Sequence, residues 1–213
     1  MNSIMKEKKT KSLRGGKPSK KKTKRININK YRVLSNKDVK LLYDITGKTI
    51  SILNKHKINY WATDGTLLGT IRNKGFIPWD DDIDIAIDIK DKQNLRSLKD
   101  VFATTNLKLV GVGKYMKVKH PTNKHIWIDI FILTKGKFPQ GHFSHLTFDE
   151  NNVKAPLKKK KFGPLKLNVP HNSEDYLHRI FKDWDKLAYI YNHQKKKKEG
   201  PFYFKDHPEL KKS

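Results

Sequence analysis

The chain has 213 residues and no cysteine. Disulfide bonds, thiolate nucleophiles and cysteine-ligated zinc sites are therefore excluded, which fits a protein kept in a reducing compartment. No apolar run approaches the roughly 20 residues that cross a membrane as a helix. The N-terminus also lacks the hydrophobic segment of a secretory signal. We therefore expect a soluble intracellular protein, in the cytoplasm, with no transmembrane segment.

Acidic side chains are scarce as well, with 21 against 47 basic ones and a net charge of +26. Residues 1–25 hold eleven Lys or Arg and a single Glu. We expect residues 1–33 to be a disordered basic tail that contacts a polyanion, or one that only aids solubility or localisation. The run Lys195–Lys198 predicts a second basic tail at 195–213. The folded domain is then expected at residues 34–194.

Hydrophobic periodicity predicts an α/β domain with a mixed β-sheet flanked by helices. From Asp82 to Ile89 every second residue is Ile, as in a strand with one buried face. Residues 126–133 predict a strand that is apolar on both faces apart from one acid. Further strands are expected at residues 58–62, 107–112 and 115–119, and helices at 36–57, 90–103 and 174–191.

Four aspartates crowd together in this basic chain: Asp80, Asp81, Asp82 and Asp84. Asp82 and Asp84 share one face of the expected strand, roughly 6.5–7 Å apart at the backbone. Such carboxylates repel one another unless a cation neutralises them, and carboxylate oxygens suit Mg²⁺ or Mn²⁺. The spacing indicates a divalent-metal site. The alternative is a solvated acidic edge of the strand.

Asp129 is a lone ionisable residue within the apolar strand at residues 126–133. Burying a carboxylate there costs free energy unless something pairs with it. If this strand lies beside Asp82 and Asp84, the three acids complete a site of the kind used in phosphoryl and nucleotidyl transfer. The alternative is a structural Asp that accepts a hydrogen bond from a backbone amide.

Gly65 and Thr66 form a turn that opens a short expected helix. Amides at a helix N-terminus, together with a hydroxyl, can hold phosphate oxygens. Arg72 and Lys74 follow about one helical turn later and could neutralise a diphosphate. Basic residues are so frequent in this chain that chance placement is the alternative.

Other candidate sites have weaker support. The histidines lack a cysteine or carboxylate that would complete a metal site, so exposed histidines are the simpler interpretation. The aromatic residues near the Gly65 turn could stack on a cytosine, although aromatics at such positions are more often core. The histidines are His120, His125, His142 and His145, and the aromatics are Tyr60, Trp61, Phe76 and Trp79.

The acid cluster belongs to a longer set of motifs. These are Asp64-Gly65-Thr66-Leu67-Leu68-Gly69, Arg72, Gly75-Phe76-Ile77-Pro78-Trp79-Asp80-Asp81-Asp82-Ile83-Asp84-Ile85, Trp127-Ile128-Asp129-Ile130-Phe131, Lys161-Phe162-Gly163 and Asp183-Trp184. Together they resemble the LicD/fukutin family of the nucleotidyltransferase-fold superfamily, over roughly residues 37–186. The central motif is long and specific.

The resemblance implies metal-dependent transfer of a phosphorylated small group, such as phosphocholine or ribitol phosphate, from a CDP-linked donor to a glycan hydroxyl. The metal would be Mg²⁺ or Mn²⁺. The resemblance also implies roles for individual residues. Gly65 and Thr66 would contact donor phosphate, Asp82 and Asp84 would hold the metal, Asp129 would bind metal or deprotonate the acceptor, and Asp80 would be an accessory acid.

Two other functions fit the same residues. A nucleotidyltransferase that places NMP on a small molecule or RNA would use the same fold and acids. A non-catalytic module that binds polyanions would explain the basic tail but not the set of mutually repelling carboxylates. Animal relatives of this family are usually membrane-anchored, lumenal and cysteine-containing, whereas this chain has no cysteine and we expect it to have no anchor.

Overall fold

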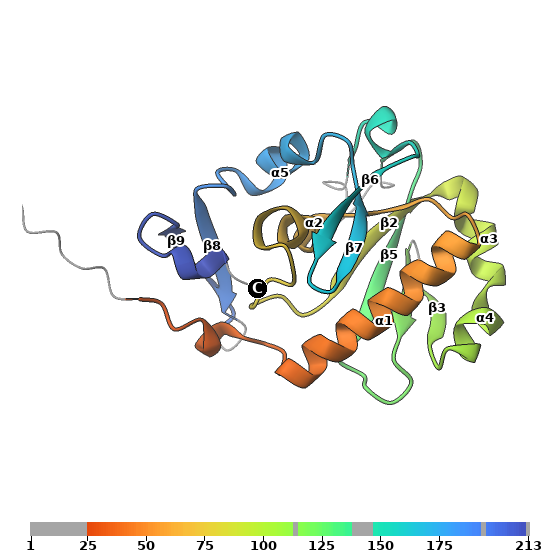
Figure 1. Ribbon diagram of the computed structural model, residues 1–213, viewed down its shortest axis with the longest axis horizontal. Helices are drawn as coiled ribbons and strands as arrows, with labels where there is room; N and C mark the ends of the chain where they lie inside the picture. The colour runs from red at the N-terminus through yellow and green to blue at the C-terminus, as the bar shows by residue number, and fades with distance from the viewer. Residues whose placement is uncertain (1–24, 113–114, 138–146, 193–194, 212–213) are drawn as a thin grey trace, which may run out of the picture.

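The computed structural model describes residues 25–112, 115–137, 147–192 and 195–211. At its centre lies a mixed sheet with strand order β1-β2-β5-β4-β3 (Figure 1). β2 and β5 pair in parallel, and the other neighbours pair antiparallel. The expected α/β class is confirmed. The strands are β1 (Tyr60–Ala62), β2 (Ile83–Asp88), β3 (Lys108–Val112), β4 (Tyr115–Lys119) and β5 (Trp127–Leu133).

The helix α1 (Asn36–Lys55) crosses one face of the sheet (Figure 1). It begins after Ser35, whose hydroxyl accepts a hydrogen bond from the amide of Asp38 at 3.1 Å, as expected of an N-cap. Leu42, Ile45 and Leu53 are buried beneath it. The short helices α3 (Lys92–Ser97) and α4 (Lys99–Thr104) lie at the β3 end of the molecule.

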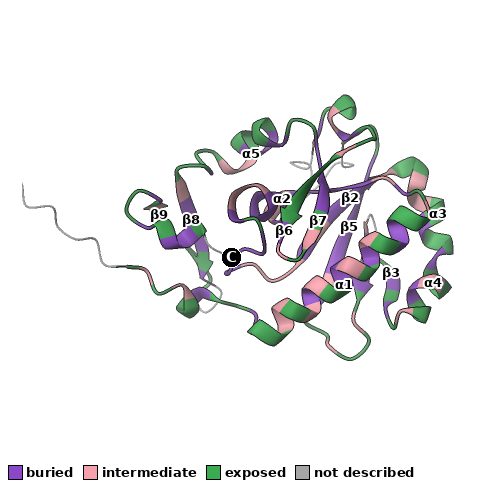
Figure 2. Ribbon diagram, viewed as in Figure 1, coloured by how far each residue is buried: buried purple, intermediate pink, exposed green. Residues whose placement is uncertain are grey.

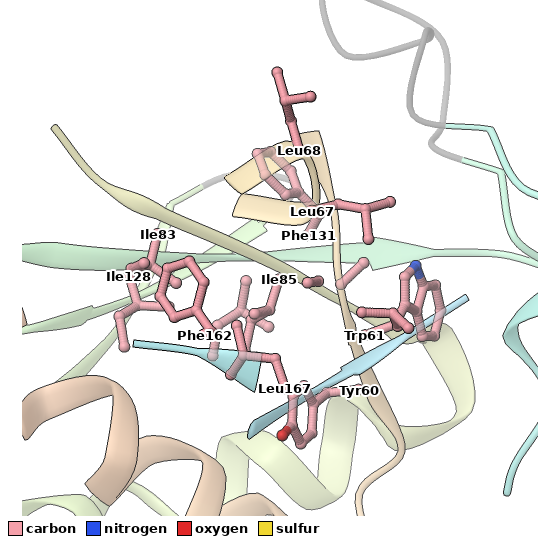
Figure 3. Packing of buried hydrophobic residues seen from close by; sticks show 14 of the residues in the cluster. Tyr60, Trp61, Leu67, Leu68, Ile83, Ile85, Ile128, Phe131, Phe162 and Leu167 are labelled. Carbon is pink, nitrogen blue, oxygen red and sulfur yellow. The ribbon is translucent and has the colours of Figure 1, made fainter. Parts of the chain in front are cut away.

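A hairpin of β6 (Lys158–Phe162) and β7 (Leu165–Val169) covers the same face. Phe162 and Leu167 from this hairpin lie against isoleucines of β2 and β5 (Figure 3). β2 and β5 are buried along most of their length (Figure 2). β2 also contacts the helix α2 (Asp64–Leu68), which continues as a π-helical turn, η2 (Gly69–Asn73), beside β6.

The C-terminal third differs from the sequence prediction. The expected helix at 174–191 ends at Phe181, because Lys182 and Asp183 adopt positive φ angles of 20° and 23°. This helix is α5 (Ser173–Phe181). The chain then forms a second hairpin of β8 (Leu187–Asn192) and β9 (Lys197–Tyr203), followed by the 3-10 helix η5 (Pro208–Lys211).

The predicted basic tail at 195–213 is therefore wrong for residues 195–211. The lysines at 195–198 are exposed on the β8–β9 hairpin, whereas Ala188 and Ile190 of the same hairpin are buried. The charge run marks a solvated face of ordered structure and does not mark the end of it. The hairpin lies at the opposite end of the molecule from α3 and α4 (Figure 1).

The N-terminal boundary also differs from the prediction of a tail at residues 1–33. Residues 1–24 lie outside the described part of the chain, as do His142 and His145. From Arg25 the chain is placed, and it forms the 3-10 helix η1 (Ile28–Tyr31). The Tyr31 hydroxyl donates to Oε2 of Glu199 at 2.6 Å, which ties η1 to the β8–β9 hairpin. In the described ranges, no helix has both the length and the apolar character needed to cross a bilayer.

Candidate functional site

Three charged residues form a row across the sheet. Asp84 on β2 is the direct register partner of Asp129 on β5, and Asp129 is the partner of Lys117 on β4. Because side chains alternate along a strand, partners in register project from the same face. The row is therefore Asp84, Asp129, Lys117, on the face opposite the Ile83, Ile85 and Ile128 core.

Asp82 completes the group from the residue just before β2. Carboxylate oxygens of Asp82, Asp84 and Asp129 all lie within 4.8 Å of one another. Asp80, Asp81 and Asp82 form a second such group, so Asp82 belongs to both. The sequence predicts that Asp82, Asp84 and Asp129 converge, and the structure brings these three acids together. Neither group contains a histidine.

Burial and mutual repulsion raise the pKa values of three acids in this cluster. Burial, followed by the charges of Asp81 and Asp129, raises the pKa of Asp82 to about 7. Burial, followed by the charge of Asp82, raises the pKa of Asp84 and of Asp80 well above the ordinary value. A cation among these oxygens would relieve both causes, since it supplies charge where water is absent.

Lys117 is an internal cation beside the acids. Its Nζ lies 3.0 Å from Oδ1 and 3.2 Å from Oδ2 of Asp129. Nζ also lies 4.6 Å from the ring centroid of Trp127 and 5.5 Å from that of Tyr115, at cation–π distances. The indole Nε1 of Trp127 donates to the same Oδ2 at 3.0 Å. Two donors therefore fix Asp129 through one oxygen.

The second oxygen of Asp129 suits a metal ion. Oδ1 is buried and accepts no hydrogen bond from the described residues, although Nζ of Lys117 is nearby. Oδ1 lies 3.0 Å from Nζ of Lys117, and with the oxygens of Asp82 and Asp84 it forms an oxygen-only donor set that fits a hard cation such as Mg²⁺ or Mn²⁺. Asp82, Asp84 and Asp129 would be its ligands.

The turn at Gly65 lies against the second acid group. A Cβ atom built on Gly65 would lie 2.6 Å from Oδ2 of Asp80, so only glycine lets this carboxylate approach the turn. Thr66 is buried, and its hydroxyl accepts a hydrogen bond from the amide of Asp84 at 2.8 Å. In this structure the Thr66 hydroxyl fixes α2 to β2 at the position of Asp84.

Arg72 and Lys74, both expected near a diphosphate, occupy different surroundings. Arg72 lies near the rings of Trp79 and Phe204, at 5.8 and 5.5 Å from their centroids. Burial lowers the pKa of Arg72 to about 10, so the guanidinium stays charged at neutral pH. Nζ of Lys74 donates to the carbonyl of Ile71 at 2.6 Å and is exposed at the end of η2.

A cavity of about 620 Å³ adjoins the acid cluster. Gly65, Asp80, Arg72 and Trp79 contribute one side of it. Of the aromatics considered from the sequence, Trp79 lines this cavity. Tyr60, Trp61 and Phe76 are core residues.

Sequence reasoning missed Lys117. One lysine in a chain with 47 basic residues carries no signal of its own. Its register opposite Asp129 would have revealed it, but antiparallel pairing of β4 with β5 cannot be read from either strand alone. The described histidines are not part of a metal site: Nδ1 of His120 accepts from the amide of Asn123 at 3.0 Å, and His125 is exposed.

Comparison with known proteins identifies several relatives of this chain. An uncharacterized protein of Rickettsia typhi is 33% identical over 172 residues, covering 78% of this chain and 53% of the relative. The human ribitol 5-phosphate transferase FKRP is 25% identical over 62% of this chain and 29% of its own length. The lipopolysaccharide cholinephosphotransferase LicD of Haemophilus influenzae is 57% identical over 35 residues, which cover 16% of this chain and 13% of LicD.

The chain thus spans about half the length, or less, of these curated relatives. Among solved structures, the lincosamide antibiotic adenylyltransferase LnuA in its lincomycin-bound form matches with a TM-score of 0.42 and 17% identity, covering 73% of this chain and 90% of LnuA. The family model described as LicD/FKTN/FKRP, nucleotidyltransferase domain, matches residues 57–172, which include β1, β2, β5 and the acid row. The chain therefore belongs to the LicD/FKTN/FKRP family.

Proposed function

We propose that this protein catalyses metal-dependent transfer of a phosphorylated small group, of the phosphocholine or alditol phosphate type, from a CDP-linked donor to a glycan hydroxyl. The observation that carries the proposal is the convergence of Asp82, Asp84 and Asp129 within 4.8 Å on one face of the sheet. An oxygen-only set of this kind suits the divalent ions that accompany phosphoryl transfer.

The relatives support the same reaction class. FKRP is named as a ribitol 5-phosphate transferase and LicD as a lipopolysaccharide cholinephosphotransferase. Both names describe transfer of a phosphorylated small molecule. The matched part of this chain holds the three acids and the Gly65 turn.

In the proposed reaction, the acceptor hydroxyl oxygen forms a new bond to the distal phosphorus of the donor. The bond from that phosphorus to the bridging oxygen of CMP breaks, and CMP leaves with the electron pair. Asp82, Asp84 and Asp129 would hold the ion, whose charge when bound neutralises the diphosphate. Alternatively, Asp129, fixed through Oδ2 by Lys117 and Trp127, would take the proton of the acceptor hydroxyl in place of binding the ion.

The substitution Asp84→Asn tests this role. It removes a charge while keeping the shape of the side chain, so we expect CMP release to fall by about 10³-fold or more while the protein stays folded. Purified protein with Mg²⁺ would be assayed for CMP release from CDP-choline, CDP-ribitol and CDP-glycerol with glycan acceptors. Asp88→Asn is the matched control, because Asp88 lies on the same strand but outside both acid groups.

Different outcomes separate the alternatives. Pyrophosphate release from an NTP, with no CMP release from any CDP donor, would favour a nucleotidyltransferase that places NMP on its substrate. Unchanged turnover by Asp84→Asn would contradict the assigned site. Absence of turnover together with binding of polyanions that depends on residues 1–25 would favour a binding module.

A further inference from the structure

The cavity beside the acid cluster has a second wall that the family match does not include. This wall comes from the C-terminal end of α5 and from the β8–β9 hairpin, all beyond residue 172. The volume of about 620 Å³ is within the usual range for small-molecule sites. The cavity reaches the acids through Gly65 and Asp80. A molecule bound in it would therefore touch Asp80, whose carboxylate lies within 4.8 Å of that of Asp82.

β8 presents an aromatic face to this cavity. Tyr189 and Tyr191 are 46% and 47% exposed, whereas Ala188 and Ile190 between and beside them are buried. Both tyrosines line the cavity, as does Lys198 of β9. Nζ of Lys198 lies 4.0 Å from the ring centroid of Tyr189. The hairpin thus presents two partly exposed rings and a positive charge to the cavity.

Arg72 lines the opposite wall. Its guanidinium lies between Trp79 and Phe204, and its Nε donates to Oδ1 of Asn73 at 2.8 Å. It forms no ion pair with any residue that the structure describes. The charge of Asp80, which lines the same cavity, favours the charged guanidinium without forming an ion pair, and a bound anion would add a direct contact.

These features define the ligand chemistry. Aromatic rings that accept a stacked planar group, together with cations on both walls, fit a planar base joined to phosphate. The geometry of the transfer reaction indicates which of the two substrates, donor or acceptor, would occupy the cavity. In-line transfer needs the attacking and leaving oxygens on opposite sides of the phosphorus. Asp80 lines the cavity and Asp82, Asp84 and Asp129 do not, so the cavity adjoins the cluster at Asp80, and an acceptor at Asp129 would leave this side for the leaving group.

We propose that the β8–β9 hairpin forms the nucleoside site of this protein. Tyr189 and Tyr191 stack on the base of a nucleoside diphosphate, and Arg72 with Lys198 pairs with its phosphates. This assignment rests on the proposed transferase function. It adds the surface that holds the nucleotide.

The test measures nucleotide binding, which does not require turnover. CDP would be titrated into the full chain by calorimetry, with UDP and ADP as comparators, with and without Mg²⁺. The double substitution Tyr189→Ala/Tyr191→Ala is expected to weaken CDP binding by about tenfold or more. Tyr203→Ala is the matched control, because Tyr203 is 46% exposed on the same hairpin and does not line this cavity. It should change the affinity less than about twofold.

Two further results would overturn the stacking assignment. One is unchanged CDP affinity in the alanine double variant with a higher KM for the acceptor, which would assign the hairpin to the acceptor and leave the transferase function intact. The other is an equal loss of affinity in Tyr189→Phe/Tyr191→Phe, because phenylalanine keeps the ring. If wild-type protein neither binds CDP nor releases CMP from any CDP donor, the transferase function itself fails. Melting temperatures of all variants verify that they are folded.

Discussion

At the scale of single residues, Lys117 balances the charge of the acid row. Its side chain is 17% exposed and that of Asp129 is 10% exposed, so the pair is shielded from water on most sides. Removing one member of such a pair leaves the other charge buried and alone, which is far more costly than losing the contact itself.

We therefore predict that Lys117→Met lowers the free energy of unfolding by about 3 kcal/mol in metal-free buffer. Chemical denaturation would measure it. Lys48→Met is the control, because Lys48 pairs with Asp44 at 2.7 Å on an exposed helix face, where such pairs contribute less than about 1 kcal/mol. Equal losses in the two variants would show that Lys117 has no special role.

Gly65 sets how closely the turn approaches Asp80. Gly65→Ala places a methyl group 2.6 Å from Oδ2 of Asp80, and that carboxylate must move. We predict that turnover falls by about tenfold or more while the fold persists, because misplacement by about 1 Å at a reacting centre costs this much or more. Kinetics and thermal melting would measure the two effects.

Gly111→Ala provides the comparison for Gly65→Ala, since a Cβ at Gly111 meets nothing within 4 Å. Activity of Gly65→Ala equal to that of Gly111→Ala would mean that the position of Asp80 does not matter for the reaction.

At the scale of elements, the β6–β7 hairpin contributes a large fully buried ring to the core. Phe162 is 0% exposed and meets Tyr43 edge-on at 5.5 Å between centroids. We predict that Phe162→Ala costs about 3–5 kcal/mol of unfolding free energy through the cavity it leaves. Denaturant titration would measure the loss. Lys160→Ala, at an exposed position of the same strand, should stay within about 0.5 kcal/mol.

The elements that carry the acids could be predicted from sequence. Strict alternation in β2 and the apolar run of β5 are local signals, and each places its acid on a definite face. The prediction that β2 lies beside β5 came from the family resemblance and from the cost of burying Asp129. The direct register of Asp84 with Asp129 confirms this prediction.

The β8–β9 hairpin could not be predicted in the same way. Tyr176, Leu177, Ile180, Phe181, Trp184 and Leu187 fit a helical period, which favoured one long helix. The helix is interrupted at Lys182 and Asp183, whose positive φ angles are imposed by tertiary structure and not by a glycine in the sequence. Residues 188–191 also show the alternation of a strand, with Ala188 and Ile190 buried and Tyr189 and Tyr191 exposed. The prediction of one long helix included these residues, so the strand was missed.

At the scale of the whole molecule, the acid cluster makes stability depend on pH. Burial raises the pKa of Asp82 from about 3.9, its usual value, to about 7 in the folded protein, and burial also raises the pKa values of Asp80 and Asp84. Between these two pH values the folded chain keeps protons that the unfolded chain has released. The free energy of unfolding that these groups contribute is therefore complete below about pH 4 and falls as pH rises through about 7.

We predict that the melting temperature of the metal-free protein decreases from pH 5 to pH 8, and that added Mg²⁺ raises it more at pH 8 than at pH 5. A metal ion binds the ionised acids of the folded state and stabilises that state by mass action. Differential scanning fluorimetry would measure both trends. Asp84→Asn should flatten the pH dependence and remove the Mg²⁺ effect. A Mg²⁺ shift of equal size at both pH values, or in the variant, would contradict the cluster as its source.

The parallel pairing of β2 with β5 also constrains how the chain reaches its native state. A slip of one residue between these strands would turn Asp129 away from Asp84 and Lys117 and press its carboxylate among the isoleucines and Phe162 on the other side. That arrangement buries a charge with no counterion, so it is heavily disfavoured. The aspartates that are proposed to act in the reaction would thus also favour the correct register of β2 with β5 during folding.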